Sequence, residues 1–312
     1  MKHKTLNDLR IIFLGTPAFA VASLNKLVEA GCNIIAVITA PDKPAGRGLT
    51  IQQTAVKEYA VDKGITVLQP DKLKDPVFVE TLRSLNADLQ VVVAFRMLPE
   101  VVWNMPPLGT INVHGSLLPQ YRGAAPINWA IINGEKITGV TTFKLRHAID
   151  TGDILLKTSL SIGEDETAGE LHDRMKEAGA QLLLETLNGI CNETLKPVQQ
   201  ENISERELKH APKLTAATGE LDFNKTKEQL HDLIRGLSPV PAAYTSLKGK
   251  KLKIFKSQKV NLPSAEAGSF ETDEKSYLRF ACSNGWISIL ELQLEGKKKL
   301  CIVEFLRGYR FQ

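Results

Sequence analysis

The sequence predicts an α/β protein in which a doubly wound, mostly parallel Rossmann-like sheet precedes a smaller C-terminal β-barrel domain of the OB-like kind. Short apolar runs alternate with amphipathic segments up to about residue 189, a pattern typical of parallel strands joined by helical crossovers. After residue 237, short β-like runs separated by turns indicate a small barrel. The length of 312 residues fits two domains, which we expect at 1–196 and 220–312 with a linker at 197–219.

The strands of the first domain are expected where short apolar runs are bounded by turn residues. A strand buried on both faces of a parallel sheet is continuously apolar rather than alternating. This pattern predicts strands at residues 10–15, 33–39, 65–68 and 89–94. The first helix is expected to have Thr16 as its N-cap and Pro17 as its first residue. Helices are predicted at 17–29, 52–63 and 77–85, with a loop at 41–49.

The later elements divide at the segment 196–219, which is polar, contains two prolines and shows little periodicity. Before it, Thr167 and Glu170 form a capping box that begins a helix ending near Gly189. Strands are also expected there at 110–114 and 139–145, with a helix at 126–132. After it we expect a helix at 226–237 and strands at 243–246, 252–255, 278–281, 286–290 and 300–303.

Composition disfavours several classes of protein. The 43% hydrophobic and 24% charged residues are ordinary for a globular chain, and no apolar run is long enough to span a bilayer. Residues 1–10 are polar and lack the apolar core of a secretory signal, so we expect a cytoplasmic protein with no membrane partner. The four cysteines are widely spaced and form no C-x-x-C pair, so we expect no metal site and no disulfide framework.

Sequence motifs of other enzyme classes are also missing. The chain has no G-x-G-x-x-G, no G-x-x-x-x-G-K-[ST], no H-E-x-x-H and no G-x-S-x-G. Dinucleotide binding, P-loop hydrolysis, zinc proteolysis and serine-esterase chemistry are therefore disfavoured.

Positive charge is concentrated in the C-terminal part. From His210 onward there are 17 Lys and Arg against 11 Asp and Glu, whereas the preceding part has 22 against 24. This imbalance indicates a polyanionic partner. A solvated, lysine-rich surface explains the same numbers, and edge-strand protection explains the lysines between 248 and 256, so charge alone leaves these alternatives open.

The residues that best indicate chemistry are Asn112, His114 and Asp150. Asn112 and His114 lie two residues apart at the end of a predicted strand, so their side chains share one face while Val113 faces the core. Ligands collect at the carboxyl ends of parallel strands, where an amide and an imidazole can both donate to a developing oxyanion. Asp150 follows another strand, and its carboxylate could orient His114 and move a proton. Satisfied polar groups at a loop start, or turn chemistry at Asp150, are the structural alternatives.

Three segments together resemble the folate-dependent formyltransferases. They are residues 112–119 (NVHGSLLP), 121–126 (YRGAAP) and 150–153 (DTGD). The resemblance covers nearly the whole chain, and other matching segments favour the branch of this family that acts on methionyl-tRNA. These are the loop at residues 44–48 (PAGRG) and the C-terminal segments 211–214 (APKL) and 234–241 (IRGLSPVP), while residues 13–20 (FLGTPAFA) also match the family.

The resemblance implies a donor, an acceptor and a set of site residues. The donor would be 10-formyltetrahydrofolate and the acceptor the α-amine of methionyl initiator tRNA, with no metal required. Asn112 and His114 would bind the formyl oxygen, and Asp150 would set His114 and assist proton transfer. The folate site would be lined by Ser116, Leu117, Leu118, Pro119, Phe95, Arg96, Met97 and Leu98. The tRNA acceptor end would approach Arg47. The positive charge of the C-terminal part, not the resemblance, adds Lys248, Lys250 and Lys251 as expected tRNA contacts.

The chain departs from the family pattern at three positions. Arg146 and Ala148 stand where the family often has Asp and Gly, shortly before Asp150, and Arg96 replaces a residue that is commonly glycine. These departures affect the loop before Asp150 and the shape of the folate pocket.

Three alternative functions remain open at this point, and we expect the chain to act as a monomer. The chain could be a relative with the same fold that formylates another amine, such as a glycinamide ribonucleotide or an amino-sugar nucleotide. It could instead hydrolyse formyltetrahydrofolate, or it could be a catalytically silent RNA-binding protein. The intact Asn112, His114 and Asp150 argue against the last of these.

Overall fold

The computed structural model describes residues 5–45, 50–201, 204, 206–263 and 265–311. It divides the chain into two compact units, each assembled from several segments. The first comprises Met1–Arg122, Gly139–Leu160 and Asp173–Lys209, and the second Gly123–Thr138, Ser161–His172 and His210–Gln312. This division differs from the single linker expected at 197–219, because two short excursions from the first half pack with the C-terminal part.

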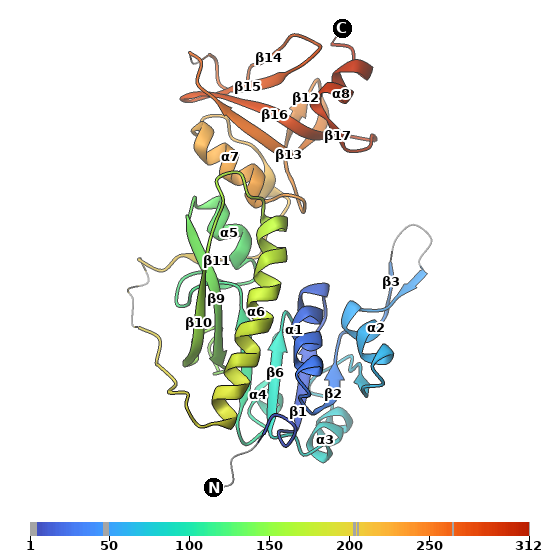
Figure 1. Ribbon diagram of the computed structural model, residues 1–312. Coiled ribbons are helices and arrows are strands. Elements are labelled where there is room, and N and C mark those ends of the chain that lie inside the picture. The colour runs from blue at the N-terminus through green and yellow to red at the C-terminus, as the bar shows by residue number, and fades with distance from the viewer. Residues whose placement is uncertain (1–4, 46–49, 202–203, 205, 264, 312) are drawn as a thin grey trace. The chain divides into compact units, whose positions relative to one another are not determined.

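The first unit is built on a sheet whose order is β10-β9-β7-β6-β1-β2-β5 (Figure 1). Its strands are β1 (Ile11–Gly15), β2 (Ile34–Ile38), β5 (Val67–Leu68), β6 (Leu89–Val93), β7 (Thr110–His114), β9 (Ile137–Lys144) and β10 (Ile154–Ser161). β1, β2, β5, β6 and β7 are parallel, whereas β9 runs antiparallel to β7. The predicted mostly parallel, doubly wound sheet is confirmed.

Helices cover both faces of this sheet, as the burial of its central strands shows. Every residue of β1 and β6 is buried, which requires apolar cover on both faces. The helices are α1 (Ala18–Glu29), α2 (Ala55–Asp62), α3 (Pro76–Ser84), α4 (Glu100–Trp103) and α6 (Ala168–Cys191). Ile12 and Leu14 of β1 pack in one cluster with Phe78 of α3 and Val102 of α4. None of the helices in the described ranges combines the length and the apolar character needed to cross a bilayer.

Capping residues in the sequence predicted most of the helix starts to within a few residues. Thr167 donates to the Glu170 carboxylate through its backbone N–H at 2.8 Å, and its Oγ1 accepts from the Glu170 N–H at 3.3 Å, which confirms the predicted capping box before α6. The predicted N-cap at Thr16 is wrong by one residue. Pro17 has extended backbone (ψ 171°) and is itself the N-cap of α1, without a side-chain cap.

Two segments expected to be irregular contain strands. Part of the predicted loop 41–49 belongs to an antiparallel hairpin of β3 (Lys43–Ala45) and β4 (Thr50–Gln52). In the expected linker, β11 (His210–Ala211) pairs with β8 (Arg122–Gly123), and a 3-10 turn, η1, covers Ala217–Gly219. Gly123 is required here, since it has φ +123° and an added Cβ would lie 2.5 Å from the Ala211 carbonyl oxygen.

The second unit contains a curled antiparallel sheet in the order β12-β13-β16-β15-β14, with β17 beside β16. Its elements are α5 (Pro126–Ile132), α7 (Lys227–Gly236), β12 (Ala243–Leu247), β13 (Lys250–Val260), β14 (Phe270–Thr272), β15 (Leu278–Cys282), β16 (Gly285–Leu294), β17 (Leu300–Cys301) and α8 (Ile302–Gly308). No pairing among the described residues joins β12 to β14, so the predicted barrel is an open half-barrel. The predicted strand at 300–303 stops at Cys301, because Ile302, Phe305 and Leu306 turn into the core as one face of α8.

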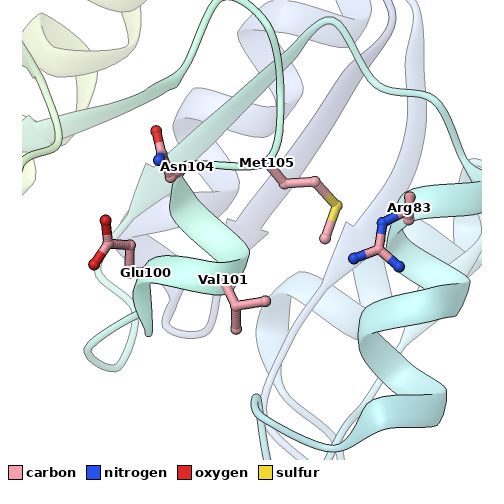
Figure 2. A pocket seen from close by; sticks show the side chains of 5 residues that line it. All are labelled: Arg83, Glu100, Val101, Asn104 and Met105. Carbon is pink, nitrogen blue, oxygen red and sulfur yellow. The ribbon is translucent and has the colours of Figure 1, made fainter.

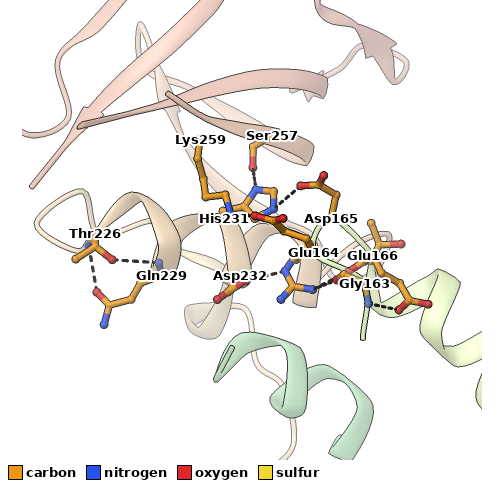
Figure 3. A network of polar contacts seen from close by, with 12 residues as sticks. Gly163, Glu164, Asp165, Glu166, Thr226, Gln229, His231, Asp232, Ser257 and Lys259 are labelled. Carbon is orange, nitrogen blue, oxygen red and sulfur yellow. Dashed lines mark hydrogen bonds and ion pairs between the residues drawn. The ribbon is translucent and has the colours of Figure 1, made fainter. Parts of the chain in front are cut away.

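Polar contacts tie α7 to the segment 163–166 of the same unit (Figure 3). Arg235 is 2% exposed, and its guanidinium donates to the carbonyl oxygens of Gly163 and Glu166, both at 3.1 Å, and to the Asp232 carboxylate at 2.7 Å. His231 is also buried, with Nδ1 3.1 Å from Ser257 Oγ. These bonds compensate for the desolvation of the Arg235 charge.

Candidate active site

The site begins at the carboxyl end of β7. Val113 is buried and faces α6, where a Cβ built on Gly179 would lie 3.3 Å from the Val113 side chain. Asn112 and His114 therefore point to the opposite face, as strand alternation requires. Asn112 is half-buried, and its side-chain amide makes no hydrogen bond to the residues that the structure describes. That amide can therefore donate to a ligand.

Both ring nitrogens of His114 face acceptors of the protein. Nε2 donates to the carbonyl oxygen of Tyr121 at 2.8 Å, since a carbonyl can only accept. Nδ1 lies 3.8 Å from Oδ2 of Asp150, and the two side chains are 7% and 12% exposed. A distance of 3.8 Å is too long for a hydrogen bond but close enough for an ion pair when the imidazole is protonated. An oxygen atom of a substrate could therefore approach His114 Nδ1 while the Asp150 carboxylate stays near the imidazole.

Asp150 is held in a tight turn between β9 and β10. Its φ of +54° lies in the left-handed region, which a non-glycine residue adopts only when its surroundings require it. Thr151 Oγ1 donates to the Ala148 carbonyl at 3.0 Å, and Arg146 donates to the Asp153 carboxylate at 2.6 Å. Arg146, one departure from the family pattern, thus stabilises this turn with a side-chain contact, whereas Ala148 accepts through a backbone carbonyl that a glycine would also offer.

A buried glutamine, which sequence reasoning missed, completes the turn. Gln200 is 6% exposed, and its Nε2 donates to the carbonyl oxygens of Asp150 and Gly152 at 2.8 and 2.9 Å. No local pattern marks Gln200, because it lies in the polar segment that was expected to be a linker. The Tyr121 carbonyl was also missed, because backbone groups leave no signal in a sequence.

The segment after His114 is mostly turned inward. Ser116 is buried and its Oγ donates to the Gln120 carbonyl at 2.6 Å, while Leu118 packs on Phe143 and Ile154. Leu117 and Pro119 are half-buried, so their side chains remain partly accessible. Of the predicted folate-lining residues here, Leu117 and Pro119 can therefore present side chains, whereas Ser116 and Leu118 shape the backbone.

The segment after β6 lies at the same edge of the sheet. Phe95 and Leu98 are half-buried against the core, and Met97 is 75% exposed. Arg96 is exposed and donates to the Asp71 carbonyl at 2.8 Å and to the Pro70 carbonyl, so its guanidinium bridges to the segment before α3. A glycine at this position would make no such bridge.

The predicted nucleic-acid contacts lie partly outside the described residues. Arg47 is one of these undescribed residues. Lys248, Lys250 and Lys251 are exposed at the turn between β12 and β13, and Lys251 Nζ lies 3.5 Å from the centroid of the Tyr244 ring. Lys248 donates to the Phe311 carbonyl. Edge protection does not explain Lys253, because there β13 pairs with both β12 and β16.

Comparison with known proteins decides the family. A family model described as "Formyl transferase" matches residues 9–187, and "Formyl transferase, C-terminal domain" matches residues 213–310. The methionyl-tRNA formyltransferase of Bacteroides thetaiotaomicron is 51% identical over 310 residues, covering 97% of this chain and 96% of the relative. That of Flavobacterium johnsoniae is 47% identical over 312 residues, with 98% of each chain covered. The chain belongs to the methionyl-tRNA formyltransferase family.

Solved structures of other formyltransferases share the fold. An N-formyltransferase from Helicobacter canadensis, in complex with folinic acid and dTDP-3-aminofucose, superposes with a TM-score of 0.69 at 23% identity, covering 94% of this chain and 100% of that chain. HypX from Aquifex aeolicus, in complex with tetrahydrofolic acid, gives a TM-score of 0.65 at 19% identity, covering 96% of this chain and 48% of HypX. Asn112, His114 and Asp150 all lie within the matched formyl transferase region.

None of these three residues lines the surface hollow of about 340 Å³ that Figure 2 shows. It is lined by Arg83, Glu100, Val101, Asn104 and Met105. Arg83 precedes β6 and Met105 precedes β7, so the hollow lies toward the amino ends of these strands. The described residues also include no group of three or more His, Cys, Asp and Glu side chains arranged to hold a metal ion.

Proposed function

We propose that this chain transfers the formyl group of 10-formyltetrahydrofolate to the α-amine of methionyl initiator tRNA and so supports translation initiation. One observation carries the proposal: His114 lies beside Asp150 at the carboxyl end of β7, with Asn112 on the same face. The choice of acceptor is supported by relatives named methionyl-tRNA formyltransferase, such as that of Phocaeicola vulgatus, which is 53% identical.

The reaction needs a positioned amine and a stabilised oxyanion. An α-amine has an ordinary pKa near 7.7 to 8.0, so a useful fraction is neutral at pH 7 and orientation matters more than activation. As the amine attacks the formyl carbon, negative charge develops on the formyl oxygen. The Asn112 amide would donate to that oxygen. His114 Nδ1 would be the second donor, because it lies 3.8 Å from Asp150 and is not engaged in a hydrogen bond with it.

Protons must also move for the transfer to finish. The attacking nitrogen loses a proton, and the folate nitrogen that leaves the formyl carbon gains one. Asp150 would take the proton from the amine side, and the Asp150–His114 pair would return it to the leaving group. The Tyr121 carbonyl holds the imidazole ring in orientation during both steps.

The donor would lie along the two loops that follow β6 and β7. Phe95, Leu98, Leu117 and Pro119 offer partly exposed apolar surface for a flat ring system. Ser116 and Leu118 would shape this pocket through their backbone, which hydrogen bonds to Thr141 Oγ1 hold in place, and Met97 would lie at the rim. Arg96 would narrow this pocket through its bridge to the Pro70 and Asp71 carbonyls.

The C-terminal half-barrel would bind the tRNA backbone. Lys248, Lys250 and Lys251 are exposed near the Tyr244 ring, and phosphate groups attract such cations in a salt-dependent way. Arg47 would contact the acceptor end. We propose that the chain acts in the cytoplasm, where charged tRNA is made, and that it acts as a monomer.

The function is tested by incubating the purified chain with methionyl initiator tRNA and 10-formyltetrahydrofolate and detecting formyl-methionine. Parallel reactions contain glycinamide ribonucleotide or an amino-sugar nucleotide, and formate is measured in all of them. Formyl-methionine as the main product supports the proposal. A faster reaction with a small amine, or formate without a formylated product, would replace it with the corresponding alternative.

The tRNA surface is tested separately with Lys250→Ala and Lys251→Ala. Each loss of a phosphate contact should raise KM for tRNA and lower the slope of log KM against log salt concentration by about 0.7 to 0.9. Lys74→Ala, at an exposed lysine of the first unit, serves as the matched control and should change neither. An unchanged salt slope in both C-terminal variants would show that these lysines do not contact the phosphate backbone.

A further inference from the structure

The side chain of Gln200 uses its whole hydrogen-bonding capacity inside the protein. Its amide nitrogen donates two bonds, to the Asp150 and Gly152 carbonyls. Its amide oxygen accepts two bonds from one guanidinium, from Arg122 Nε at 3.2 Å and from Arg122 Nη2 at 2.7 Å. A primary amide has two N–H groups and two lone pairs, so every one of them has a partner. Such saturation in a buried side chain indicates a geometric requirement.

These bonds close a ring of contacts around the His114–Asp150 pair. His114 bonds to the Tyr121 carbonyl, and Arg122 is the next residue in the chain. Arg122 bonds to Gln200, and Gln200 bonds to the turn that carries Asp150. Asp150 then faces His114 Nδ1 at 3.8 Å. One glutamine thus links the backbone that orients the imidazole to the backbone that carries the carboxylate.

This ring of contacts also stabilises two unfavourable backbone conformations. Tyr121 has φ +60° and Asp150 has φ +54°, and each such residue costs about 1 to 3 kcal/mol unless its surroundings compensate. A second anchor lies two residues before Gln200, where Val198 and Ile154 exchange a pair of backbone hydrogen bonds at 2.8 Å. This pairing fixes Gln200 beside the turn.

We propose that Gln200 is a positioning residue for formyl transfer, which sets the separation between Asp150 and His114 by tying the Asp150 turn to Arg122. The inference rests on the proposed function, because the separation matters only if the pair handles the proton of the attacking amine. Gln200 touches neither His114 nor the Asp150 carboxylate in these contacts, so it acts through the backbone alone.

The substitution Gln200→Glu separates the two halves of the linkage. A glutamate keeps an acceptor for Arg122 but has no N–H to donate, so its oxygens would face the Asp150 and Gly152 carbonyls and repel them. The turn should move away while the link to Arg122 remains. The matched control is Gln199→Glu, the same change at the neighbouring residue, which is exposed.

The enzyme assay measures kcat and both KM values for the full chain with methionyl-tRNA and 10-formyltetrahydrofolate. Gln200→Glu should lower kcat by about 10- to 100-fold, as expected for a displacement near 1 Å, and leave both KM values within about twofold. Gln199→Glu should behave as the parent does. A parent-like kcat in Gln200→Glu, or a loss confined to KM, would overturn the proposal.

A second measurement needs no substrate and therefore separates this inference from the proposed function. The ring nitrogens of His114 are followed by ¹⁵N NMR in histidine-labelled protein and assigned with His114→Gln. At one fixed pH, Gln200→Glu should move these signals in the same direction as Asp150→Asn, and Gln199→Glu should leave them in place. Signals that Gln200→Glu leaves in place would refute the positioning role. If Gln200→Glu moves the signals but the parent protein formylates no tRNA, only the proposed function is refuted. If Gln200→Glu does not fold, Gln200→Ala buries no charge and carries the same expectations.

Discussion

Substituting Gly152 by alanine should disrupt the turn that carries Asp150. A Cβ added at Gly152 would lie 1.5 Å from the Lys144 carbonyl oxygen and 2.8 Å from its carbonyl carbon, both backbone atoms that cannot rotate away. Since ordinary contacts begin at about 3.4 Å, the turn must retreat by nearly 2 Å. Three hydrogen bonds are then at risk: two from Gln200 to the turn and one from the Lys144 N–H to the Asp153 carbonyl at 2.9 Å.

The expected losses follow from these contacts. Three hydrogen bonds at about 1 kcal/mol each give about 3 kcal/mol of unfolding free energy, or about 6 to 12 °C in Tm for a unit of this size. A displacement of Asp150 by more than 1 Å should lower kcat by about 100-fold or more. Gly308→Ala is the matched control, because a Cβ there meets no atom within 4 Å. Thermal unfolding and formyl-transfer kinetics measure both effects, and a Gly152→Ala protein that matches Gly308→Ala in both would refute the reasoning.

Three further predictions concern single side chains. Asn112→Ala should lower kcat by about 10²- to 10³-fold, the usual loss of one oxyanion donor, and an unchanged kcat would exclude that role. Burial, with Lys259 nearby, lowers the pKa of His231 from its ordinary 6.5, so the unfolded chain binds a proton that the folded chain does not. The free energy of unfolding should therefore fall as pH drops through about 6.5, and His231→Gln should flatten that slope in urea titrations; a slope equal to the parent's contradicts this. Burial raises the pKa of Cys32 to about 11, so only about one thiol in a thousand is ionised at pH 8, whereas Cys301 is exposed. Iodoacetamide should modify Cys301 long before Cys32 by mass spectrometry, and comparable rates would show that Cys32 is accessible.

The elements with local signals were predicted well from the sequence. Continuous apolar runs gave β1, β2 and β6 within about one residue, because a strand buried on both faces needs apolar side chains at every position. The capping box of Thr167 and Glu170 marked the start of α6, since its hydrogen bonds involve residues three apart. Where the pairing partner is distant in sequence, as for β8 and β11, no local pattern was available. The end of β17 was misjudged because a short apolar run fits a strand or one face of a helix.

The sequence by itself determined which groups could do the chemistry. Strand periodicity placed Asn112 and His114 on one face, and the motifs around them pointed to formyl transfer. Only the tertiary structure decided how His114 is bonded, how far Asp150 lies from it, and that Gln200 and Arg122 hold the turn between them. Side-chain type and strand period are local properties of the chain. The separation of two atoms that lie 36 residues apart depends on backbone carbonyls and long-range hydrogen bonds, which form only when the whole unit has folded.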